Sequence, residues 1–146
     1  MSRRHIPAAP HVAPRAYVDP VDDAEAALAV FRLAVSDPPV HETLAFLLDH
    51  DGRGGTIVAV SGTTAPEALF TVVGAMCCMA RRDREACSLV VATVRPDDVV
   101  VAGDVDRWSA ATELADSYGI ELVEWFVITP GDVVVPRAST GEPERW

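Results

Sequence analysis

Four aspartates placed close together are the first feature of this sequence that could do chemistry. They lie within ten residues and are Asp97, Asp98, Asp104 and Asp106. Four carboxylates can bind a hard cation, but their spacing does not match an EF-hand loop and no glutamate stands at the closing position. The alternative is a solvated loop, followed by acids that stabilise the N-terminus of the next helix.

Cysteine and histidine provide the second set of candidates. The thiols are Cys77, Cys78 and Cys87, and the imidazoles are His5, His11, His41 and His50. A catalytic thiol needs a nearby base or a helix N-terminus to lower its pKa. Cys77 and Cys78 lie late in an apolar helical stretch, which favours inert thiols in the core. No histidine has the spacing of a zinc site; His50 between Asp49 and Asp51 is a local cluster that a polar hairpin loop also explains.

Two further motifs are incomplete. The glycine-rich segment "DGRGGT" lacks the G-x-x-x-x-G-K-[ST] pattern, and it is not placed between a strand and a helix, as phosphate binding requires. The segment "SGTTAPEA" lacks the G-x-S-x-G pattern of a nucleophile elbow. A flexible turn is the simpler interpretation of the first segment.

Composition restricts the classes of partner. The 146 residues fit one domain, and 49% hydrophobic with 23% charged residues is typical of a globular protein. The net charge is −10 and every basic residue is arginine, so repulsion from phosphates argues against nucleic acid as a partner. No apolar run reaches the roughly 18 residues of a membrane span. An odd cysteine count without a secretory signal predicts a cytoplasmic protein.

The order of elements predicts an α/β domain. Residues 1–20 contain four prolines and are expected to form a flexible N-terminal arm, 21–138 a single domain, and 139–146 a C-terminal tail. A helix follows Asp22 and Asp23, and one of its faces contains Ala24, Leu28, Phe31 and Val35. "ETLAFLLD" and "TIVAVSG" are expected to form an antiparallel hairpin.

The second half of the chain continues this alternation. A helix over 66–82 is apolar nearly all round and should be buried on most sides, with Thr63 or Thr64 as its cap. "ACSLVVATV" predicts a central strand. A helix beginning near Asp106 should bury Trp108, Ala111, Ala115 and Tyr118 and end before Gly119. "IELVEWFVI" and "VVVP" complete a mixed sheet flanked by helices, because a hairpin and crossover helices both occur.

Several blocks of the chain resemble a known family. "AFLLDHDGR", "VAVSGTTAPEALFTVVGAM", "SLVVATVRPDD" and "ELADSYGIELVEWFVI" follow the order and spacing of the JAB/MPN (JAMM) domain, in its bacterial RadC-like branch. The resemblance covers about Asp22 to Ala138. Active members of that family are metalloproteases, in which two histidines and an aspartate hold zinc, a glutamate is the general base and a serine stabilises the oxyanion.

The resemblance implies that the metal-binding motif is degenerate here. The two histidines correspond to Thr93 and Arg95, the serine to Gly103, the aspartate to Asp106, and the glutamate to Ile57 or Val58. The motif's proline is present as Pro96. Arg95 would place a permanent positive charge where the metal should bind. We therefore expect no metal, no cofactor and no catalytic residue, and the sequence favours a protein that is not an enzyme.

Three functions follow from this resemblance. The first is a non-catalytic interaction or regulatory module, in which Arg95 pairs with Asp106 and the partner is another protein or a second copy of the chain. The second is a metal-dependent hydrolase or isopeptidase with a rearranged site built from His50 and the four aspartates. The third is a DNA-associated RadC-like protein, which the acidic charge disfavours.

Overall fold

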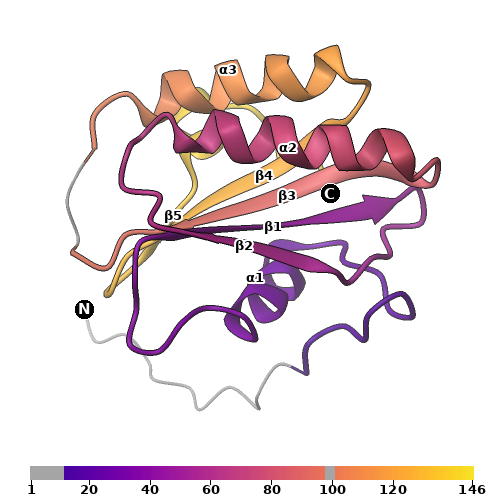
Figure 1. The fold of residues 1–146 in the computed structure, drawn as a ribbon, viewed down its shortest axis with the longest axis horizontal. Helices are drawn as coiled ribbons and strands as arrows, with labels where there is room; N and C mark the ends of the chain where they lie inside the picture. Colours follow the sequence, from indigo (N-terminus) through magenta and orange to yellow (C-terminus); the bar gives the residue numbers. More distant parts are fainter. Residues whose placement is uncertain (1–11, 98–100) are drawn as a thin grey trace.

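A five-stranded mixed sheet organises the chain (Figure 1). The computed structural model describes residues 12–97 and 101–146. Its elements are α1 (Ala24–Arg32), β1 (Glu42–Asp49), β2 (Ile57–Ser61), α2 (Ala68–Arg82), β3 (Ala86–Val94), α3 (Asp104–Ser117), β4 (Glu121–Ile128), β5 (Val133–Val134) and the 3-10 helix η1 (Pro136–Thr140). This order confirms the predicted single α/β domain with a mixed sheet.

The strand order in the sheet is β2-β1-β3-β4-β5. β1 pairs antiparallel with both β2 and β3, β3 pairs parallel with β4, and β4 pairs antiparallel with β5. The parallel step requires a crossover, which α3 provides. The three inner strands are buried on both faces, and for this reason they appear in the sequence as continuous apolar runs.

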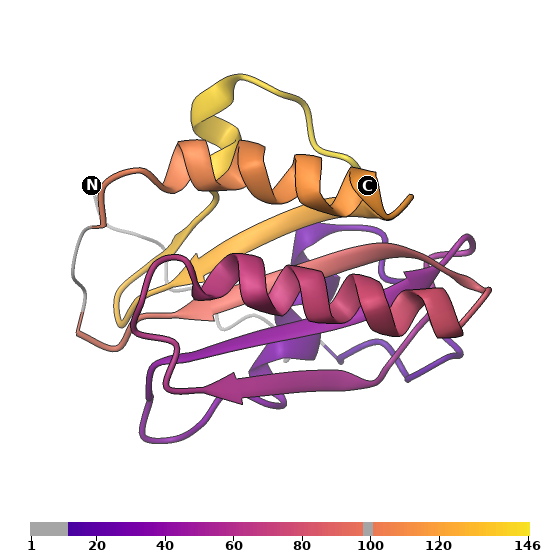
Figure 2. The ribbon, with the colours of Figure 1, turned by 45° about the horizontal axis from the view of Figure 1, so that its top comes forward.

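The helices cover both faces of the sheet and create two separate cores. α2 and α3 lie on one face and α1 on the other (Figures 1 and 2). The core under α2 and α3 includes the buried indoles of Trp108 and Trp125. The core under α1 is built around Phe31, whose ring centroid lies 4.9 Å from that of Phe46 and 6.2 Å from that of Phe126. Among the helices of the described residues, none has both the length and the apolar character needed to cross a membrane.

Helix α1 begins where the two aspartates predicted it. The Oδ1 atom of Asp23 accepts a hydrogen bond of 2.7 Å from the backbone N–H of Ala26, which caps the first turn. All four residues of the predicted face pack against the core, and Phe31 is fully buried there. Ala27 and Val30, which the prediction left out, are buried more deeply than Ala24, Leu28 and Val35. The helix ends at Arg32, so Val35 reaches the core from the segment that follows.

The prediction for α2 was wrong in two respects. Its side chains are not buried on most sides, because α2 lies in a single layer on the sheet and its outer face meets solvent. The exposed residues of that face include Thr71, Ala75, Cys78 and Met79. Neither threonine caps the helix: the cap position is Glu67, and the Thr63 hydroxyl instead accepts a 2.9 Å hydrogen bond from Thr43.

Helix α3 buries Trp108, Ala111 and Ala115 as predicted, whereas Tyr118, its C-cap residue, is only partly buried against the same core. It begins at Asp104, earlier than the predicted start near Asp106. Gly119 follows its last turn with φ 75°, and the N–H of Ile120 donates to the carbonyl of Ala115. This left-handed position is the one for which the sequence selects glycine.

Two glycine substitutions should change stability in opposite directions. We expect Gly119→Ala to lower the free energy of unfolding by about 1–2 kcal/mol, because a Cβ is strained at its φ of 75°. Gly74→Ala should raise it by about 0.5–1 kcal/mol, because Gly74 lies within α2 and its added Cβ meets no atom within 4 Å. Urea denaturation of the two variants measures both changes, and two changes of the same sign would contradict this account.

Candidate functional site

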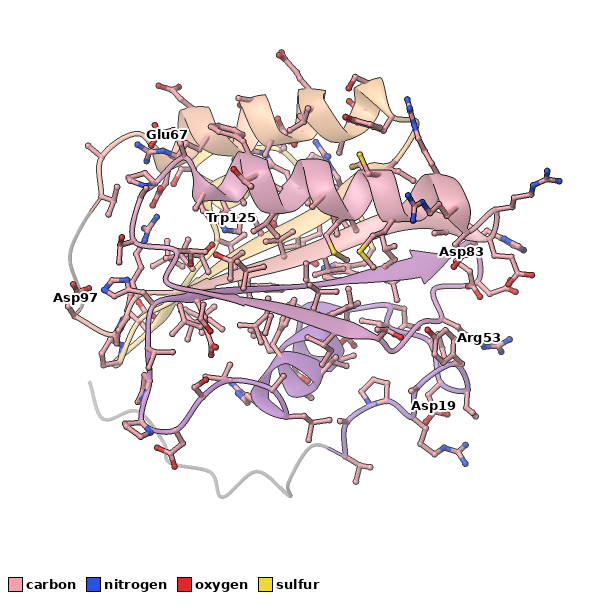
Figure 3. All side chains as sticks on the ribbon, viewed as in Figure 1. Asp19, Arg53, Glu67, Asp83, Asp97 and Trp125 are labelled. Carbon is pink, nitrogen blue, oxygen red and sulfur yellow. The ribbon has the colours of Figure 1, made fainter. Side chains whose placement is uncertain are left out.

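One edge of the sheet, at the ends of its strands, is formed by the carboxyl ends of β3 and β4. The amino ends of α2 and α3 lie there as well. The two strands are parallel, so their ends meet there, and in α/β proteins this edge commonly carries the functional side chains. In Figure 3, Glu67 and Asp97 mark this end of the molecule, whereas Arg53 and Asp83 mark the opposite end. The predicted positions Thr93, Arg95 and Gly103 all lie at or next to this edge.

Arg95 is the centre of a partly buried ionic cluster at this edge. Its Nη1 donates to Oδ2 of Asp104 at 2.6 Å, and its Nη2 donates to Oδ1 at 3.0 Å. Arg107 Nη1 donates to the same Oδ1 at 3.0 Å and to the carbonyl of Ala102 at 2.8 Å. The side chains of Arg95 and Asp104 are only 10% and 18% exposed. We call Arg95, Asp104 and Arg107 the Arg95 cluster.

The predicted partner of Arg95 was wrong, because the ion pair forms with Asp104 and not with Asp106. Gly103, with φ 91°, occupies the N-cap position and makes Asp104 the first residue of α3. Residues two apart on a helix do not share a face. Asp106 is therefore exposed on another side of the first turn, away from the cluster.

Thr93 uses its hydroxyl within the core. Its Oγ1 accepts a 2.9 Å hydrogen bond from Nε1 of Trp125, and both residues are buried. In the sheet register Thr93 lies beside Thr43, which in turn lies beside Val60. Ile57 and Val58, to which the resemblance assigns the general base, lie at the start of β2, opposite Phe46 and Ala45.

The structure separates the residues of the rearranged hydrolase site. His50 follows the far end of β1, an eight-residue strand whose ends are more than about 20 Å apart at roughly 3.3 Å per residue. At that end His50 Nε2 lies 3.9 Å from Asp51, and both side chains are exposed. His50 is therefore not brought to Asp104 or Asp106. Asp98 lies outside the described residues.

A histidine without a predicted role does reach this edge. His41 Nε2 lies 3.2 Å from Oδ2 of Asp97, at the surface beside the Arg95 cluster. His41 immediately precedes β1 and Asp97 follows β3, and the pairing of Glu42 with Val94 brings them together. The proximity of His41 and Asp97 depends on the register of two strands, which the periodicity of the sequence does not reveal.

The thiols differ in their surroundings. Cys77 is buried, as predicted, and burial raises the pKa of its thiol. Burial, followed by the charges of Asp49 and Asp51, also raises the pKa of Cys87. A raised pKa makes a thiol a poor nucleophile at neutral pH. The prediction of a core position was wrong for Cys78, which is exposed on the outer face of α2.

A second buried ion pair lies under η1. Arg137 Nε donates to Oε2 of Glu124 at 2.9 Å, and the Glu124 side chain is 2% exposed. Burial raises the pKa of the Glu124 carboxyl, and Arg137 offsets part of that rise. The pair fixes η1 to β4. No sequence pattern indicates this pair, because its two residues lie in different elements with no periodic relation.

Replacing Thr93 should show how much its hydroxyl contributes to the stability of the fold. We expect Thr93→Val to lower the free energy of unfolding by about 1–3 kcal/mol, because the Trp125 N–H would be left buried without an acceptor. Thr93→Ser retains the hydroxyl and is expected to cost less. Urea denaturation, monitored by the fluorescence of the buried indoles, compares the two variants. A loss for Thr93→Ser as large as that for Thr93→Val would mean that the methyl group contributes as much as the hydrogen bond.

Neither a group of metal ligands among the described residues nor a known relative assigns a function to this chain. Within 12–97 and 101–146, no three His, Cys, Asp or Glu side chains are grouped so that they could hold a metal ion. No protein-family model and no curated protein matches this chain.

Proposed function

We propose that this chain is a non-catalytic JAB/MPN-like domain, of the RadC-like kind, that acts as an interaction or regulatory module. The observation that carries the proposal is the Arg95 cluster. At the strand end where the resemblance places a zinc ligand, the guanidinium of Arg95 makes two hydrogen bonds to Asp104. The hydroxyl at the other histidine position, Thr93, is already bonded to Trp125.

The charges of the cluster support this interpretation. Arg95 and Arg107 carry two positive charges, Asp104 carries one negative charge, and Glu67 Oε1 lies 3.9 Å from Arg107 Nε. The exposed carboxylate of Glu67 thus balances the one net positive charge of the Arg95 cluster. A divalent cation placed beside Arg95 would meet a permanent positive charge at close range, which costs free energy in a partly buried site.

The two alternative functions gain no support. A rearranged hydrolase would need His50 close to Asp104 and Asp106. His50 instead lies at the far end of β1. A DNA-associated protein would have to overcome a net charge of −10.

Zinc analysis and an isopeptidase assay test the proposal together. The full chain, purified after expression in zinc-supplemented medium, should contain far less than one zinc per chain and should not cleave an isopeptide-linked substrate. Asp106→Ala and the matched variant Asp116→Ala, which removes another exposed acid of α3, should leave both results unchanged. Stoichiometric zinc or turnover that Asp106→Ala abolishes and Asp116→Ala retains would refute a non-catalytic domain.

A further inference from the structure

The outer edge of β2 has unpaired backbone groups. Among the described strands β2 pairs only with β1, and Figure 2 shows it as the outermost strand on the side of the sheet nearer α2. The N–H of Gly62 donates to the carbonyl of His41 at 2.8 Å. Bonded pairs alternate along an antiparallel ladder, so Val58 and Val60 direct their backbone groups to β1. Ile57, Ala59 and Ser61 direct theirs outward.

This edge lacks the features by which natural proteins prevent strand pairing. Exposed edges usually carry charged side chains, proline or a bulge. The strand Ile57–Ser61 has no charged residue, no proline and no register shift. Ala59 is exposed and Val60 is 39% exposed, so apolar surface accompanies the free backbone groups.

The sequence segment that contains this strand has almost no charge. Of 12 basic and 22 acidic side chains, only Glu67 lies between Gly54 and Ala80. That segment includes β2 and nearly all of α2, whose outer face exposes Cys78 and Met79, the latter by 45%. Charged side chains are common in the rest of the chain, so the lack of charge is confined to this segment. A neutral region of this length is expected where the surface is covered by a partner.

We propose that β2 pairs antiparallel with β2 of a second copy of this chain, about a two-fold axis at Ala59. The two Ala59 residues then exchange backbone hydrogen bonds, as do Ile57 and Ser61 of the other copy. Val58 faces Val60 of the second copy in a non-bonded pair, where side chains approach most closely. The two sheets become one continuous sheet.

Charge identifies the partner as a second copy. A different protein attracted to a chain of net charge −10 would be basic and would bind the acidic surface. Two copies with this net charge repel each other overall, so close contact costs least through a neutral region. An antiparallel strand pair is self-complementary and closes at two copies. This inference holds whether or not the edge beside Arg95 is catalytic.

Sedimentation velocity of the full chain over a concentration series tests the pairing. We expect a species of twice 15.6 kDa that dissociates on dilution. Val60→Lys should shift the equilibrium to monomer, because the ammonium would face Val58 of the second copy. The matched control is Val134→Lys, on the opposite edge strand β5, where the valine is 47% exposed. It should remain dimeric, and circular dichroism establishes that both variants are folded.

A cysteine placed on the axis tests the same contact without adding charge. Bonded pairs have Cα atoms about 5.5 Å apart, which is within the range that a disulfide spans. In a Cys78→Ser background, Ala59→Cys should form a covalent dimer on mild oxidation, and a reductant should reverse it. A wild-type monomer at every concentration, open-ended polymers, or a dimer that Val134→Lys dissociates and Val60→Lys does not would each overturn the proposal.

Discussion

Asp104→Ala is expected to lower the free energy of unfolding by about 3–5 kcal/mol. The substitution leaves Arg95 and Arg107 without the carboxylate that they share, in a site where these side chains are 10% and 16% exposed. Removing one partner of a buried ion pair is costly, because the remaining charge has lost its hydration and gains nothing in return. Urea denaturation at neutral pH measures the loss.

Two variants make this prediction specific. Asp106→Ala removes an exposed acid from the same helical turn and should cost less than about 1 kcal/mol, the size of a helix-dipole effect. The double variant Arg95→Met with Asp104→Leu should recover most of the loss, because apolar side chains can replace a buried pair at little cost. Equal losses for Asp104→Ala and Asp106→Ala would show that Asp104 acts only through the helix dipole.

Glu124→Ala should cause a loss of similar size, about 3–5 kcal/mol. The guanidinium of Arg137, whose side chain is 8% exposed, would lose its only carboxylate partner among the described residues and keep a bond to the carbonyl of Glu142. Because η1 packs against α3, we also expect the fluorescence of Trp108 to change. A loss below about 1 kcal/mol would mean that Arg137 moves to solvent when its partner is removed.

The stability contributed by Glu124 should also depend on pH in a defined direction. Burial raises the pKa of its carboxyl above the value in the unfolded chain, so the folded state binds a proton more readily. The protonated carboxyl of Glu124 therefore contributes to the free energy of unfolding. This contribution is complete below the ordinary glutamate pKa and is lost as the pH rises through the raised pKa. The stability of the wild type relative to Glu124→Gln should therefore fall with rising pH. Urea denaturation of both proteins over this pH range measures the difference, and a difference that rises with pH would contradict this account.

The order of elements could be predicted because its signals are local. Asp23 caps α1 within one turn, and Gly119 ends α3 through its own backbone conformation. The buried strands are marked by unbroken apolar runs, of which β3 is the clearest. None of these signals depends on how distant segments are aligned.

The contacts of the candidate site could not be predicted, because they depend on alignment between elements. The resemblance assigned Asp106 to the former metal site, and hence to Arg95, whereas the carboxylate that meets Arg95 is that of Asp104, the first residue of α3. The approach of His41 to Asp97 follows from the register of β1 on β3. The residues that meet at the end of β3 come from separate elements, so only the three-dimensional arrangement identifies them.

The two cores on opposite faces of the sheet imply that the chain can open in parts. α1 has nine residues and is held mainly by Ala27, Val30 and Phe31, whereas α2 and α3 share a larger core around two buried indoles. Detaching α1 would expose one face and leave the other layer intact. Amide hydrogens of α1 should therefore exchange with solvent through a local opening, and those of β3, which is paired on both sides, only when the whole domain unfolds.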